Sequence, residues 1–191
     1  AGDGITTAGS NTGLGYRALS APSNSGANNT AVGTDALLSN TTGANQTAIG
    51  RKAMEDTTTG GYNTAVGAEA LGNNLTGVHN IAVGYIALLA ATTGDYNVAV
   101  GNSSLRYTTT ADGNTAMGHE ALYANTTGAS NTAVGSYALD ANTTGNYATA
   151  IGTNALSANT TGNNNVAIGE TSLATNTTGD SNVAVGRAAL T

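Results

Sequence analysis

The stretch that decides the fold is NTAVGSYAL, residues 131–139, because its pattern returns along the whole chain. The glycine of this motif recurs eleven times, and the spacing between successive copies is constant except for the first, which is longer by one position. A fixed period of this kind indicates a solenoid of stacked coils. We therefore treat residues 1–191 as one repeat domain, whose motif glycines are Gly15, Gly33, Gly50, Gly67, Gly84, Gly101, Gly118, Gly135, Gly152, Gly169 and Gly186.

Several columns of residues keep a constant size from coil to coil. The residue before each motif glycine is aliphatic in all eleven coils, Ala lies two residues before it in ten, and Leu lies four residues after it in ten. We expect the aliphatic column to be core. A second glycine lies seven residues before the motif glycine from the second coil onward, except at Ala111. This corner glycine predicts a turn with positive φ or a close backbone approach.

The residues before the motif glycine have the character of strands. Segments such as 132–134 and 166–168 are short, β-branched and bounded by turn residues, which is typical of strands and excludes a helical repeat. Two glycine corners and one such strand per period predict the fold class: all-β, a parallel β-solenoid, or β-roll, of about eleven 17-residue coils. Successive coils would hydrogen-bond at about 4.8 Å spacing.

Neither face of the strands has the polar composition expected of a solvent-exposed face. Val134 and Thr132 point one way and Ala133 the other, and both columns are restricted in size. We expect the Leu column to fill the coil interior and the Ala face to pack closely against another copy of the chain. Asn lies four residues before the motif glycine in nine coils, which predicts a ladder of amides along the axis.

Composition excludes several functional classes. The net charge is −6, and the chain has only five Lys and Arg residues. This excludes a nucleic-acid-binding protein that works by neutralising phosphates. There is no Cys, there are two His, and no apolar run reaches about 18 residues, so we expect no metal site and no membrane insertion. The carboxylates never pair at a fixed site, and no nucleophile constellation is present, so we expect no catalytic residues, no enzyme activity and no cofactor.

The repeat resembles a known family. VAIG at 166–169, its relatives TAVG, TAIG and VAVG, and the preceding Asn resemble the head repeats of YadA-type trimeric autotransporter adhesins and repeats of phage tail fibres. The resemblance implies a left-handed β-roll of three chains, located outside the cell, on its surface or on a virion, and contacting host surfaces. The 17-residue period and the recurring NTTG corner depart from the shorter adhesin repeat.

Two sets of residues are candidate sites. Aromatic residues lie five positions before the motif glycine at Tyr62, His79, Tyr96 and Tyr147, which indicates either a platform for carbohydrate or rings that stack for stability. Asn-x-Thr triplets at the corners are either acceptors for N-glycosylation in a secretory route or simple turns; these are Asn40, Asn74, Asn125, Asn142, Asn159 and Asn176.

We therefore predict a non-enzymatic extracellular or virion fibre protein, a structural shaft or adhesin that self-assembles as a homotrimer and contacts host-surface carbohydrate. The alternative is an ice-binding solenoid, because Thr recurs three residues before the motif glycine and again at the corner. The segments 6–8 and 187–191 read as partial coils. They predict either a piece of a longer fibre or end-to-end stacking into filaments.

Overall fold

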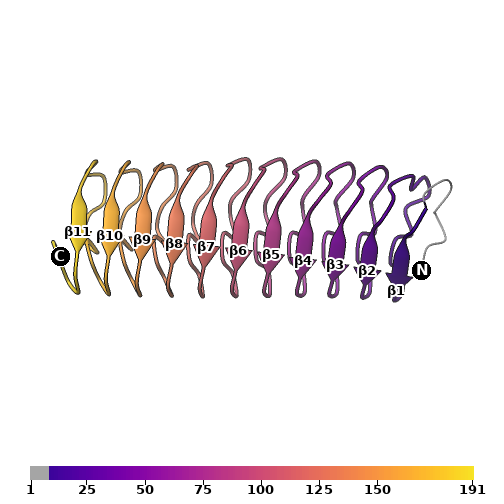
Figure 1. Ribbon diagram of the computed structural model, residues 1–191, viewed down its shortest axis with the longest axis horizontal. Coiled ribbons are helices and arrows are strands. Elements are labelled where there is room, and N and C mark those ends of the chain that lie inside the picture. The colour runs from indigo at the N-terminus through magenta and orange to yellow at the C-terminus, as the bar shows by residue number, and fades with distance from the viewer. Residues whose placement is uncertain (1–8) are drawn as a thin grey trace.

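The computed structural model describes residues 9–191 as one row of stacked coils, with one strand per coil (Figure 1). The eleven strands pair in parallel in sequence order, and each residue lies opposite its counterpart in the next repeat, as Ala133 does opposite Ala150. Residues 1–8, with the partial coil expected at 6–8, lie outside the described part. The strands are β1 (Thr12–Leu14), β2 (Thr30–Val32), β3 (Thr47–Ile49), β4 (Thr64–Val66), β5 (Ile81–Val83), β6 (Val98–Val100), β7 (Thr115–Met117), β8 (Thr132–Val134), β9 (Thr149–Ile151), β10 (Val166–Ile168) and β11 (Val183–Val185).

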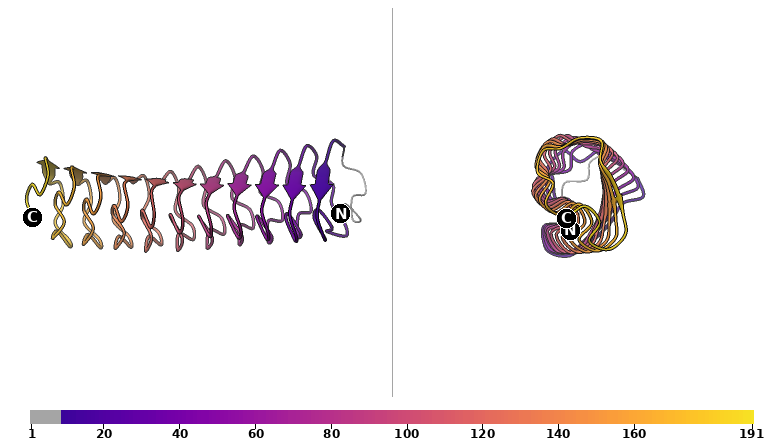
Figure 2. Two further views of the ribbon diagram at one scale, coloured as in Figure 1. Left: turned by 90° about the horizontal axis from the view of Figure 1, so that it is seen from below. Right: turned by 90° about the vertical axis from the view of Figure 1, so that its left-hand side faces the viewer.

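The predicted fold class is confirmed: the described chain is an all-β solenoid in which each coil hydrogen-bonds to the next on every side. Viewed along its axis, the coils superimpose with a gradual rotation from one end of the molecule to the other (Figure 2). Hydrogen bonds between coils continue beyond the strands, for example from the Leu139 N–H to the Ala155 carbonyl at 2.9 Å. The regular period therefore satisfies backbone groups even where the chain turns.

The coil turns at non-glycine residues with positive φ, which the sequence did not predict. In the repeat around Gly135, three residues other than glycine have positive φ: Ser130 at 59°, Tyr137 at 58° and Leu139 at 54°. The motif glycine itself has φ 134°. The corner glycine does not have positive φ; it avoids a steric clash, because a Cβ on Gly128 would lie 2.5 Å from Oδ1 of Asn125.

The interior is narrower than expected, and this reverses the predicted facing of the strands. The alanine column of the strands lies inside, with Ala133 fully buried, and forms one cluster with the leucine column. The aliphatic column, predicted to be core, points outward, and Ile151 is 39% exposed. A coil this short holds one large side chain, and Leu takes that place, so only methyl groups fit behind the strand.

The predicted amide ladder is confirmed, and it lies inside the coil. The side-chain N–H of Asn97 donates to the Ala111 carbonyl at 2.8 Å, and its Oδ1 accepts the Asn114 N–H at 3.0 Å. The corner asparagines form a second buried ladder, in which Asn142 Nδ2 donates to Asn125 Oδ1 at 2.9 Å. Amides therefore supply the buried hydrogen bonds that a thin apolar core cannot.

Candidate functional site

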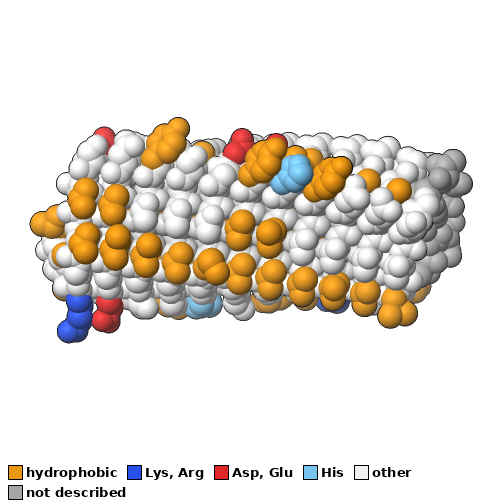
Figure 3. Space-filling view, viewed as in Figure 1, with side chains coloured by type: hydrophobic (Ala, Val, Ile, Leu, Met, Phe, Trp, Pro, Cys, Tyr) orange, Lys and Arg blue, Asp and Glu red, His pale blue; other side chains and the backbone are white. Residues whose placement is uncertain are grey.

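The most extensive surface feature is the outward side of the sheet, which we call the outer sheet face. It consists of the aliphatic column and of the column three residues before the motif glycine, which is Thr in seven coils. In Figure 3 the aliphatic column forms a continuous hydrophobic row along the molecule. The row is Leu14, Val32, Ile49, Val66, Val83, Val100, Met117, Val134, Ile151, Ile168 and Val185.

The outer sheet face is open to solvent and carries no charge. In its middle, Ile81 is 42% exposed and Met117 is 45% exposed. Neither column contains a Lys, Arg, Asp or Glu. At about 4.8 Å per coil, the row extends for roughly 50 Å, which is long for an apolar stripe on a monomeric soluble protein.

The predicted aromatic column borders this face. The Tyr62 and His79 rings are stacked with centroids 5.0 Å apart, and the His79 and Tyr96 rings with centroids 5.1 Å apart. Tyr62, His79 and Tyr96 each have φ 58°, which turns the side chain away from the coil. The two tyrosines are 60% and 62% exposed. The regular spacing of the repeat thus builds an exposed stack of three rings.

Tyr147 belongs to the same column but lies three coils beyond Tyr96. The two positions between them are Gly113 and Ser130. Neither residue carries an aromatic ring, so the ring column is interrupted over two coils. The structure therefore brings three of the four predicted residues together and leaves Tyr147, 65% exposed, apart from them.

A second aromatic group was missed by sequence reasoning. The Arg106 guanidinium lies 5.2 Å from the Tyr107 ring centroid and 5.9 Å from that of Tyr123. The hydrogen bond with Tyr107 and burial raise the pKa of Tyr123 above its usual value. The signal was present in the sequence, since Arg106 and Tyr123 are one period apart.

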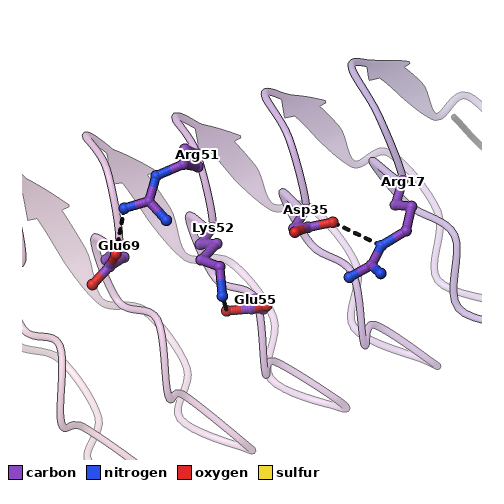
Figure 4. Close-up of polar contacts among 6 residues, drawn as sticks. All are labelled: Arg17, Asp35, Arg51, Lys52, Glu55 and Glu69. Atoms are coloured by element: carbon purple, nitrogen blue, oxygen red, sulfur yellow. Dashed lines mark hydrogen bonds and ion pairs between the residues drawn. The ribbon is translucent and has the colours of Figure 1, made fainter.

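Charged side chains pair between coils more than the sequence suggested. Arg17 donates to Asp35 at 2.8 Å, and Arg51 pairs with Glu69 in the next coil (Figure 4). Lys52 pairs with Glu55 within one coil at 3.1 Å. These partly exposed pairs contribute little to stability individually, but they neutralise charge near the N-terminal coils.

The side-chain amides of the corner asparagines are not available for attachment of a glycan. Asn40, Asn74, Asn125, Asn142 and Asn159 are fully buried, and in each of them Nδ2 donates to the carbonyl of the following corner glycine. Asn176, in the last corner, makes the same bond at 3.0 Å. A glycan on Nδ2 would need space that the interior does not have, so the turn interpretation of these triplets fits the folded coil.

The threonines of the corner divide into two roles. The first Thr of the corner donates its hydroxyl to the next coil, as Thr143 does to the Thr160 carbonyl at 3.0 Å. The second, such as Thr144, is exposed. One hydroxyl column thus remains for solvent at this corner.

Residues 9–191 contain no cluster of three or more side chains suited to a metal ion and no enclosed pocket. Over the same range, no helix is long and apolar enough to cross a bilayer. The surface features of the described chain are therefore open columns.

No protein-family model, curated protein or solved structure matches this chain. The relation to YadA-type heads and tail fibres thus stays a prediction from the repeat itself.

One carboxylate gives a pH-dependent test of the structure. Burial raises the pKa of Asp140, two backbone N–H bonds lower it, and the charge of Glu120 raises it further. Its Oδ1 is buried without a hydrogen-bond partner. Because the folded-state pKa lies above the unfolded one, ionisation costs stability as the pH rises through the folded value.

We therefore expect Asp140→Asn to raise the melting temperature at pH 7 and to leave it almost unchanged at about pH 3, below the ordinary pKa of aspartate. Thermal melts of both proteins at the two pH values check this. The exposed Asp56→Asn variant is the control, and an equal gain there would contradict the burial argument.

Proposed function

We propose that this chain is a non-enzymatic segment of an extracellular or virion fibre, a structural shaft or adhesin that assembles with copies of itself. The observation that carries the proposal is the uninterrupted aliphatic row on the outer sheet face. A partner for this row must match its periodicity over the whole length. A second copy does so, because the same residue type recurs at the same spacing on both surfaces.

Three copies around a common axis are the assembly we propose, with the left-handed coil that the family resemblance implies. Burying the row between chains removes apolar area from water at about 25 cal/mol per Å². No charge has to be desolvated, because neither column of the outer sheet face contains one. The few ion pairs, such as Arg17 with Asp35, lie in other columns and stay hydrated.

The mass in solution tests the assembly. We expect the wild-type chain, of 18.6 kDa, to run at three times its chain mass in light scattering and native mass spectrometry. The double variant Val83→Asp with Val100→Asp buries two charges at the centre of the interface, so we expect it to run as a single chain with an unchanged β-sheet circular dichroism spectrum.

Thr76→Asp with Thr93→Asp provides the matched control, because it places two charges on exposed corner threonines. We expect this variant to keep the wild-type mass. A wild-type monomer at micromolar concentration would contradict the assembly. A mass that grows steadily with concentration would point to end-to-end filaments in place of a closed trimer.

For the adhesin role, we propose that the aromatic column contacts host-surface carbohydrate. Exposed aromatic rings offer flat apolar faces to the C–H faces of sugars. The column lies beside the outer sheet face and not within it, so the trimer leaves Tyr62, His79 and Tyr96 accessible. Binding of the wild-type protein to a printed glycan array tests this role.

An ice-binding solenoid is the second candidate, and the outward orientation of the Thr column favours it. Thr132 and Thr149 are part-exposed on adjacent strands of a regular sheet. Thermal hysteresis separates the two functions: activity in a single-chain species would support ice binding, whereas a trimer buries this face and would show none.

A further inference from the structure

The aromatic column contains a gap, and we propose that the gap is a binding site for one pyranose ring of a glycan. The site lies over Gly113, between the exposed face of Tyr96 and the side chain of Ser130, with Asp112 at its rim. It rests on the proposed glycan-binding role and assigns that role to a particular place on the fibre.

The ring positions of the column set the shape of the gap. Tyr62, His79 and Tyr96 occupy three successive coils, with interplanar angles of 13° and 5° between neighbouring rings. His79 covers one face of Tyr96. In the next coil Gly113 has no side chain, so no residue of this column covers the other face of Tyr96. The stack stops at a ring with one open face.

The space over Gly113 is free. A Cβ built on Gly113 would meet only Oγ of Ser130, at 3.6 Å. Gly113 has φ 69° and Ser130 has φ 59°, so both positions keep the backbone conformation that turns side chains outward. The backbone ladder also continues, because the Gly113 N–H donates to the Asp95 carbonyl at 3.0 Å. The missing ring is therefore a change of side chain and not a distortion of the coil.

The open face of Tyr96 can accept a saturated ring. Neighbouring rings of this column are stacked with centroids 5.0 and 5.1 Å apart, but neither Gly113 nor Ser130 carries a ring, so the space beyond Tyr96 is not limited to the thickness of one flat ring. A pyranose chair, whose axial hydrogens project from the ring, can therefore rest on the Tyr96 face.

Polar groups at the gap match sugar hydroxyls. Asp112 is exposed and adjoins Gly113, and its Oδ1 accepts the Asp95 N–H at 2.8 Å, which holds the carboxylate beside the coil of Tyr96. A carboxylate oxygen accepts hydrogen bonds from sugar hydroxyls strongly. On the other side, the Ser130 hydroxyl can donate or accept. An aromatic face, an oriented carboxylate and a hydroxyl thus border the open space over Gly113.

The experiment fills the gap. Gly113→Tyr introduces a ring in a column where Tyr62, Tyr96 and Tyr147 already adopt φ 58°, so we expect the variant to fold and to block the site. Binding of methyl β-glucoside, methyl β-galactoside and methyl β-N-acetylglucosaminide is followed by saturation-transfer NMR, with the acyclic polyol glucitol as the comparison. Circular dichroism and the melting temperature check that each variant is folded.

We expect the wild-type trimer to bind at least one pyranoside and not glucitol. Gly113→Tyr and Tyr96→Ser should each weaken binding by about tenfold or more. Gly113→Ala, which leaves the gap open, and Tyr85→Ser, an exposed tyrosine outside the aromatic column, should bind like the wild type. The Tyr96→Ser variant keeps the test decisive if the introduced ring disturbs the fold.

The outcomes separate this inference from the proposed function. If the wild type binds glycan and Gly113→Tyr binds equally well, the gap is not the site, although the adhesin role survives. If the wild type binds neither the pyranosides nor any glycan on the array, the inference and the glycan-binding role both fail. The mass of the wild-type chain still decides the shaft assembly independently.

Discussion

Replacing Gly118 by alanine is expected to destabilise the solenoid by about 2–6 kcal/mol, combining backbone strain of about 1–3 kcal/mol with overpacking of similar size. Gly118 has φ 142°, a backbone conformation that residues with a side chain rarely adopt. A Cβ there would lie 2.5 Å from the Gly135 oxygen and 2.6 Å from its carbonyl carbon. That backbone cannot move away freely, because the Gly135 N–H donates to the Met117 carbonyl at 2.8 Å.

Urea unfolding followed by far-ultraviolet circular dichroism measures this loss. Gly113→Ala is the matched control, since its φ of 69° lies in the region where other residues of its column sit, and the nearest atom to a Cβ is 3.6 Å away. We expect the control to lose about 1–2 kcal/mol, the ordinary cost of a Cβ in the left-handed region. Equal losses at the two positions would show that the close approach of neighbouring coils is not what requires the motif glycine.

Replacing Asn97 by alanine is expected to cost about 2–4 kcal/mol, because buried polar groups left without partners cost about 1–3 kcal/mol each. The Asn97 side chain is fully buried. Its loss removes the donor to the Ala111 carbonyl and the acceptor of the Asn114 N–H. The chain already has one interruption of this ladder, at Ala148, so we expect the variant to fold.

The same unfolding measurement with two further variants tests the ladder. Asn97→Gln keeps an amide, as Gln46 does in its own coil by accepting from Asn63 at 3.1 Å, and should recover part of the loss. Asn73→Ala, at an exposed position, should change stability by less than about 0.5 kcal/mol. A loss from Asn73→Ala as large as that from Asn97→Ala would contradict the role assigned to the buried amides.

Much of the candidate site can be predicted by counting residues, because residues separated by one repeat period lie side by side in neighbouring coils. Tyr62, His79 and Tyr96 follow one another at intervals of one period, so a solenoid with one coil per period must place them side by side. Tyr147 comes three periods after Tyr96 and must lie three coils away. The same arithmetic places Arg106 beside Tyr123, and only the scatter of aromatic residues over several columns concealed that group.

The corner asparagines show where such arithmetic stops. Their Asn-x-Thr triplets have the composition of exposed turns, and nothing local distinguishes a turn that points outward from one that folds its amide inward. In the structure the Gly145 carbonyl accepts both Asn142 Nδ2, at 3.0 Å, and Asn131 Nδ2, at 2.9 Å. These two asparagines are not separated by a whole period, and the closure of the coil brings them together.

By itself the sequence determined the period, the strand positions, the parallel in-register stacking and the strand amide ladder, because in a stack of equal coils each residue's neighbour is its own counterpart one period away. The tertiary structure alone decided which side of each strand faces inward. Ala133 and Val134 are both small and apolar, so alternation does not distinguish their faces. The choice depends on the room left in the coil once Leu139 occupies it, and that is a property of the closed cross-section.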